Sequence, residues 1–181
     1  VMVSRLPGVQ IIDLTHEAYV HWPAEAGFWL ERSYQYFPKG TVHLAVVDPG
    51  VGTDRDVLLV IGDGHAFLAP DNGLLGDVVA RVRGTVYRVD PARLKGFGIE
   101  RLSATFHGRD LFAPLAAELA GGRAVPASIG APTLDYVPSL IDAPFSFLIL
   151  DLTSDGTPTG LTCDVKREQL AMPPELELFD W

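Results

Sequence analysis

The stretch T-V-H-L-A-V-V-D-P-G-V-G-T-D-R, residues 41–55, decides the fold that we predict for this chain. Its apolar run over residues 42–47 is typical of a buried strand, and the Pro-Gly pair that follows ends the strand in a turn. Asp48 is therefore expected at the carboxyl end of the strand, with Arg55 seven residues later in a glycine-containing loop. In open α/β sheets, ligands bind at the carboxyl ends of strands.

A second polar motif, T-F-H-G-R-D at residues 105–110, precedes a helical pattern over residues 111–120 that closes with two glycines. This order predicts a helix that begins just after the motif. His107 and Arg109 are therefore expected near a helix start.

Further strand-like and helix-like segments alternate along the chain. The strand-like segments are residues 9–14, 57–62, 65–69, 85–89 and 145–152, and the helix-like segments are residues 24–36 and 74–82. Asp63-Gly64 predicts a tight hairpin turn between two of the strands. The alternation predicts an α/β layered fold with a mainly parallel central sheet flanked by helices. We place one α/β domain at residues 1–130, followed at residues 131–181 by a Pro-rich connection, one strand and a terminal arm.

The composition excludes several classes of partner. The chain has 181 residues, 48% of them hydrophobic, which suffices for one sizeable core. Fourteen basic and 23 acidic residues give a net charge of -9, and no basic run is present, so no nucleic acid partner is expected. A single cysteine excludes an internal disulfide, and no apolar stretch approaches the roughly 20 residues of a membrane span. We expect a soluble cytoplasmic protein without membrane contact.

Together with I-I-D-L-T-H-E at residues 11–17 and A-P-D-N-G-L-L at residues 69–75, the two motifs occur in an order that closely resembles the S-adenosyl-L-methionine hydroxide adenosyltransferase family. That family is related to fluorinating and chlorinating enzymes. The resemblance covers residues 1 to about 130. It implies a catalytic trio of Asp48, Arg55 and His107, no cofactor, no metal, and a homo-oligomer, most simply a trimer.

The implied reaction is attack of water or hydroxide on C5′ of the substrate S-adenosylmethionine, which releases methionine and leaves adenosine. The sulfonium departs as a neutral thioether and needs no general acid. Water is a poor nucleophile near neutral pH, and a guanidinium beside an imidazole can stabilise hydroxide character on it. Asp48 is expected to orient the water and His107 to help deprotonate it.

Each member of the trio also has a purely structural interpretation. Asp48 before Pro-Gly can be only a turn former, Arg55 a solvated surface charge, and His107 a helix cap. We interpret Arg109 and Asp110 as an ion pair that holds their loop.

The resemblance extends to substrate-binding positions. It implies that Thr105, Phe106 and Gly108 line the pocket, with Phe106 as an apolar wall. An aromatic position near methionine or ribose corresponds to His21 or Trp22, and the local pattern does not decide between them; we assign Trp22.

The remaining polar residues receive structural interpretations. Asp71-Asn72-Gly73 is expected to form a turn rather than a ligand site. We expect His16 and His43 to be core histidines and His65 to lie on the surface.

The sequence departs from the family at both ends. The family's first strand with its T-D-F-G turn, whose aspartate holds the ribose, and its C-terminal β-barrel are not visible. The segment F-L-I-L-D-L-T-S-D-G at residues 147–156 resembles that missing strand and turn. One interpretation is a circular permutation in which Asp155 binds the ribose. The alternative is that this strand begins a shortened C-terminal domain.

Other functions compete with hydrolysis. The missing adenine-binding domain allows a non-catalytic nucleoside-binding or regulatory remnant of the family. A divalent-metal hydrolase that uses Asp48, His107 and Asp110 is less favoured, because no closely spaced ligand set accompanies them. Halide as nucleophile is disfavoured because halogenating relatives replace the Asp and His of the trio, and both remain here.

Overall fold

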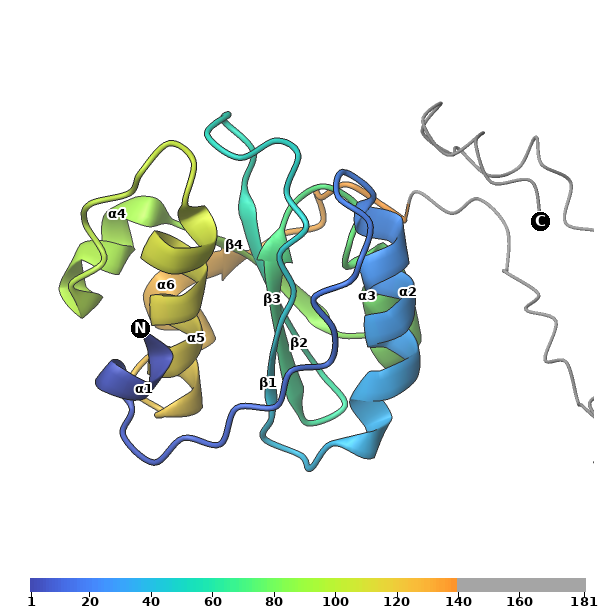
Figure 1. Ribbon diagram of the computed structural model, residues 1–181, viewed down its shortest axis with the longest axis horizontal. Coiled ribbons are helices and arrows are strands. Elements are labelled where there is room, and N and C mark those ends of the chain that lie inside the picture. The colour runs from blue at the N-terminus through green and yellow to red at the C-terminus, as the bar shows by residue number, and fades with distance from the viewer. Residues whose placement is uncertain (140–181) are drawn as a thin grey trace, which may run out of the picture. The chain divides into compact units, whose positions relative to one another are not determined.

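The computed structural model describes residues 1–139, which form a three-layer α/β unit (Figure 1). The sheet contains β1 (Val42–Leu44), β2 (Val57–Gly62), β3 (His65–Pro70), β4 (Thr85–Val89) and β5 (Gly130–Pro132). One face is covered by α1 (Met2–Arg5), α4 (Pro91–Leu94), α5 (Ala113–Ala120) and α6 (Pro126–Ile129), and the other by α2 (Pro23–Ser33) and α3 (Gly76–Val82). The predicted layered α/β class is confirmed.

The predicted mainly parallel sheet is wrong. The strand order is β1-β3-β2-β4-β5, and of these neighbours only β1 and β3 are parallel. The reason is the β2–β3 hairpin, which the sequence does predict: Asp63 and Gly64 both have positive φ, as a two-residue turn of this kind requires. The hairpin places β2, running in the opposite direction, between β3 and β4. Both of those strands run the same way, and the chain passes from one to the other through α3.

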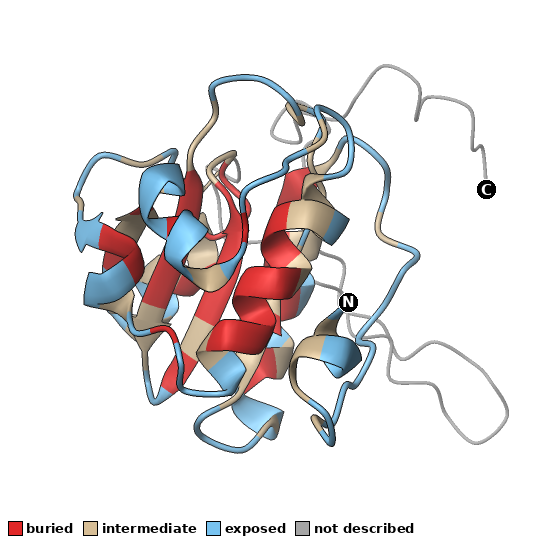
Figure 2. Cartoon of the chain, turned by 90° about the vertical axis from the view of Figure 1, so that its left-hand side faces the viewer, coloured by how far each residue is buried: buried red, intermediate tan, exposed pale blue. Residues whose placement is uncertain are grey.

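Alternate residues of β2 supply the two hydrophobic cores, one on each face of the sheet. Leu59 packs with Phe112 and Leu115 on the α5 side, and Leu58 packs with Leu30 and Val78 on the α2 side. Figure 2, viewed from the α5 side, shows buried residues along that helix and the strands behind it. The short strands therefore have both faces covered.

Two predicted strands are shorter in the structure or missing from it. Residues 9–14 form no strand, and Ile11 and Ile12 are exposed. The strand predicted over residues 42–47 is assigned only at β1, although the Ala45 N–H still donates to the Leu68 carbonyl at 3.1 Å. Beyond that bond the chain leaves the ladder and turns toward Asp48.

The predicted helices also differ in detail. The helix predicted at residues 24–36 is α2 followed by a 3-10 turn, η1 (Tyr34–Tyr36). The helix predicted at residues 111–120 begins with a π-helical turn, η3 (Gly108–Phe112), which leads into α5. Pro114 explains the wider turn, because proline has no N–H and its ring crowds the carbonyl four residues earlier.

Two further findings concern the limits of this unit. The domain boundary predicted at residue 130 falls inside β5, which pairs with β4 through Val89 and Gly130. Across residues 1–139, no helix combines the length and apolar character needed to cross a membrane.

Candidate active site

Asp48 and Arg55 form a buried ion pair within the loop that joins β1 to β2. The Arg55 Nε donates to Asp48 Oδ1 at 2.6 Å, and Arg55 Nη2 donates to Asp48 Oδ2. Their side chains are only 5% and 9% exposed. Two parallel hydrogen bonds fix both groups in one plane, so neither the turn-only nor the solvated-charge interpretation describes them.

His107 comes to this pair from a different part of the chain. It is the N-cap of η3, and its Nδ1 lies 3.1 Å from Arg55 Nη2. A guanidinium only donates hydrogen bonds, so His107 Nδ1 is the acceptor and the ring proton of the neutral imidazole is on Nε2. The structure thus brings together the three residues that the sequence motifs single out.

The guanidinium of Arg55 packs over the ring of Phe112, a contact that was not predicted from the sequence. The ring of Phe112 is fully buried, and its centroid lies 5.4 Å from the guanidinium carbon. His107 and Phe112 lie at the two ends of the π-helical turn, which lets both side chains reach the same arginine. Pro114 inside a helical pattern was the available signal for this irregular turn.

Gly52 explains how the two loops of the site approach so closely. Its φ is +81°, and a side-chain carbon added there would overlap the carbonyl of Ala104, in the loop that leads to His107. A residue without Cβ is therefore needed on both counts. The sequence places Gly52 in a glycine-containing loop but does not show that Ala104 is its neighbour.

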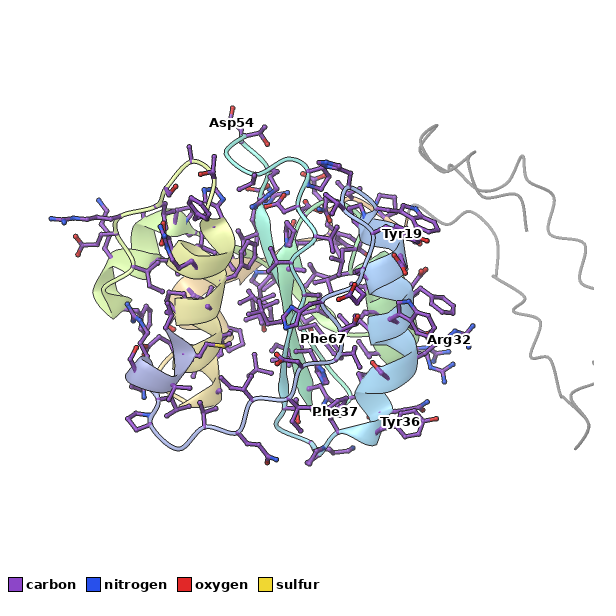
Figure 3. All side chains as sticks on the ribbon, viewed as in Figure 1. Tyr19, Arg32, Tyr36, Phe37, Asp54 and Phe67 are labelled. Carbon is purple, nitrogen blue, oxygen red and sulfur yellow. The ribbon has the colours of Figure 1, made fainter. Side chains whose placement is uncertain are left out.

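The predicted substrate-binding residues come from two separate segments of the chain, the loop around His107 and the start of α2. Thr105, Phe106 and Gly108 flank His107. Phe106 is 56% exposed, and the Arg109 guanidinium carbon lies 4.8 Å from the centroid of its ring. Trp22 is the N-cap of α2, half-buried, and packs near Tyr19. Figure 3 shows Tyr19 near the start of α2 and Asp54 at the tip of the β1–β2 loop.

Trp22 is not part of the hydrogen-bonded trio. Asp155 lies outside the described residues.

Two interpretations of neighbouring residues are confirmed. Arg109 Nε lies 2.6 Å from Asp110 Oδ1, and Asp110 Oδ2 accepts a hydrogen bond from the Ser103 N–H at 3.1 Å, so the pair holds its loop. The Arg109 hydrogen bond lowers the pKa of Asp110. The Asp71-Asn72-Gly73 turn is present, with the Leu74 N–H donating to Asn72 Oδ1 at 3.3 Å.

The other histidines correct two expectations. His43 is buried as predicted, but His65 is also buried, at 4% exposure, while the His16 side chain is 80% exposed. His65 is two residues before Phe67 in β3, so both side chains face the same core. The His43 Nε2 and His65 Nδ1 atoms are 3.2 Å apart, and burial, followed by the charge of His65, lowers the pKa of His43 to about 4.

Metal ligands do not cluster in the described part of the chain. Residues 1–139 contain no group of three or more His, Cys, Asp or Glu side chains arranged to hold an ion. Asp48 and Asp110, the carboxylates of the metal-hydrolase alternative, each carry an arginine partner.

Comparisons with known proteins agree with the motifs. A family model described as the SAM hydroxide adenosyltransferase N-terminal domain matches residues 1–130. The chain is 40% identical over 141 residues to an "(R)-S-adenosyl-L-methionine hydrolase" of Salinispora tropica, covering 77% of this chain and 50% of that protein. It is 30% identical over 145 residues to a fluorinase of an Actinoplanes species, covering 67% of this chain and 48% of that protein.

A solved structure shares the fold. An uncharacterized conserved protein from Thermotoga maritima superposes with a TM-score of 0.70 at 36% identity, covering 76% of this chain and 52% of that one. The chain therefore spans about half the length of the relatives that it matches.

Proposed function

The chain belongs to the SAM hydroxide adenosyltransferase family, and we propose that it catalyses the hydrolysis of S-adenosyl-L-methionine to adenosine and L-methionine without a metal or other cofactor. The observation that carries the proposal is the position of Arg55, whose guanidinium contacts both Asp48 and His107. Arg55 thereby connects three polar groups from two distant motifs, and such a group of preorganised side chains can stabilise a nucleophile.

In the proposed step, the oxygen of a water molecule forms a bond to C5′ of the substrate while the C5′–sulfur bond breaks. The electron pair of that bond goes to sulfur, which leaves as the neutral thioether of methionine. The water loses one proton, and its oxygen becomes the 5′-hydroxyl of adenosine. Most of the activation free energy of this step is needed to give the water hydroxide character. The positive charge of Arg55 stabilises that character.

The tautomer of His107 supports a donor role in this proposal, in place of the base role expected from sequence. Because Arg55 donates to Nδ1, Nε2 carries the proton and can donate to the oxygen of the nucleophile. Asp48 holds the guanidinium in place and directs its charge. The proton lost by water is released to solvent.

We also propose that Thr105, Phe106, Gly108 and Trp22 contact the substrate, and that Asp155 binds its ribose. Exposed apolar side chains in the two loops that carry the trio, namely Val46, Leu102 and Phe106, favour a homo-oligomer that covers these loops. A trimer is our specific proposal. Light scattering at the concentration used for turnover tests it, and a fully active monomer would contradict it.

The proposed reaction is tested by incubating the purified chain with S-adenosylmethionine in H₂¹⁸O, and following products by chromatography and mass spectrometry. We expect adenosine with ¹⁸O in its 5′-hydroxyl, unlabelled methionine, and the same rate with chelator present. Binding without products would instead support the non-catalytic alternative. Loss of activity on chelation would support the metal-dependent alternative.

A further inference from the structure

We propose that Asn72 is a positioning residue for Asp48, an inference that rests on the proposed function. Its side-chain Nδ2 donates a hydrogen bond at 2.9 Å to the carbonyl of Val47, the residue immediately before Asp48. Asn72 is in the A-P-D-N-G-L-L motif, which the reaction itself does not use. The bond connects that motif directly to the trio.

The Val47 carbonyl needs such a partner because of where the strand ladder stops. The last ladder bond after β1 runs from the Ala45 N–H to Leu68, and the next turn bond runs from the Val51 N–H to the Asp48 carbonyl. Between them the chain bends from the sheet into the loop. A side-chain donor at this point fixes the direction in which the backbone enters Asp48.

Turn formation alone does not explain asparagine at this position. The turn uses only Oδ1, which accepts from the Leu74 N–H, and an aspartate would form the same turn. The bond to Val47 uses the amide NH₂, which aspartate lacks. Asn72 therefore makes two side-chain hydrogen bonds: Oδ1 stabilises its own turn, and Nδ2 holds the residue before Asp48.

The turn that contains Asn72 packs on the hydrophobic core. Leu74 and Leu75 are buried in the core on the α2 side. Helix α2 packs directly on this turn, because a side-chain carbon at Gly27 would overlap the Leu74 carbonyl. Asn72 thus links Asp48 to the hydrophobic core, and a displacement of its amide is transmitted to the Asp48–Arg55 pair.

The test compares Asn72→Asp, which keeps the turn acceptor and loses the donor, with Asn72→Ala, which loses both. The matched control is Thr53→Ala, which removes the 2.7 Å bond from a side-chain hydroxyl to the Gly50 carbonyl in the same loop. For Asn72→Asp we expect kcat to fall by roughly 10-fold or more with KM little changed, as for a displaced reacting group. Thr53→Ala should keep the wild-type kcat.

A second readout does not depend on turnover. The Nε–H of Arg55, bonded to Asp48, should exchange with solvent faster in Asn72→Asp than in wild type, as measured by NMR. Unchanged kcat and unchanged exchange in a folded Asn72→Asp protein would overturn the inference. If the wild-type chain forms no adenosine, the proposed function fails, while the exchange measurement still decides whether Asn72 positions Asp48.

Discussion

The two ends of β1 bury polar side chains in opposite ways. Beyond its carboxyl end, Asp48 and Arg55 are buried as charges that neutralise each other through two hydrogen bonds. Toward its amino end, His43 is stacked on Phe67 with ring centroids 4.9 Å apart and shares a contact with His65. Figure 3 shows Phe37, which packs on His43, and Asp54 at opposite ends of the sheet.

A buried polar group keeps its charge only where a matched partner compensates it. A carboxylate and a guanidinium with matched geometry compensate each other's lost hydration. A histidine among aromatic rings has no such partner, so burial lowers its pKa and it stays neutral at pH 7. The charged end is the one that can stabilise a nucleophile, and at the neutral end His43 packs within the core.

The largest effect is expected from Arg55→Ala, which leaves the Asp48 carboxylate buried without its partner. We expect turnover to fall by roughly 100-fold or more. The free energy of unfolding should also fall by about 3–5 kcal/mol, because a buried charge then lacks its partner. Denaturant unfolding measures this second effect.

The control for Arg55→Ala is Lys39→Ala, at the other end of β1. The Lys39–Asp63 pair spans 3.6 Å and is largely exposed. Removing it should change stability by less than about 1 kcal/mol. Equal losses of stability in the two variants would show that burial does not distinguish these ion pairs.

At the neutral end we expect an acid-sensitive contribution to stability from His43. The pKa of His43 is 6.5 in the unfolded chain and about 4 in the folded chain, so the unfolded chain binds the proton more readily. The contribution of His43 to the free energy of unfolding is therefore complete above pH 6.5 and is lost as the pH falls toward 4. The loss should reach about 3 kcal/mol. Urea unfolding at several pH values measures it.

His43→Phe keeps the stacked ring and removes the titration, so its stability should depend less steeply on pH than that of wild type. His16→Gln removes an exposed histidine and should leave the wild-type slope. If His43→Phe keeps the full slope between pH 4 and 6.5, other groups account for the acid sensitivity.

The third prediction compares a histidine at the charged end, His107, with one at the neutral end, His65. His107→Ala should lower turnover by about 100-fold because the donor to the nucleophile is lost, with little change in stability for a half-buried ring. His65→Ala should destabilise the fold and keep the turnover of the folded fraction. Adenosine formation and thermal unfolding, measured on both variants, separate the roles; a His107→Ala protein with near-normal turnover would contradict the assignment.

These differences also show what could be predicted from the sequence. The hairpin and the grouping of Asp48, Arg55 and His107 were predictable because local turn chemistry and ordered motifs encode them. The contacts of Phe112 and Gly52 were not, since they depend on a π-helical turn and on a loop distant in sequence. The prediction that His65 lies on the surface is wrong because its alternation with Phe67 in β3 turns it to the core, although a position directly after a turn is typical of surface residues.

The antiparallel course of β2 follows from the predicted hairpin, and this local turn overrides the parallel sheet that the alternation of strands and helices favours. Residues 9–14 have a strand-like pattern, yet a strand also needs a neighbour, which no local pattern specifies. The predictions for residues 140–181, Asp155 among them, lie outside the described residues and stay predictions.

The smallest expected effect compares two glycines that flank β1, Gly40 before it and Gly52 after it. Both have positive φ, +90° and +81°, so alanine at either position costs about 1–2 kcal/mol of stability. A methyl group at Gly40 has open space around it, whereas one at Gly52 overlaps the Ala104 carbonyl and must push the two site loops apart. We therefore expect Gly52→Ala to lower turnover by roughly 10-fold or more, and Gly40→Ala to leave it unchanged. Equal turnover in the two variants would mean that the close approach at Gly52 does not hold His107 against Arg55.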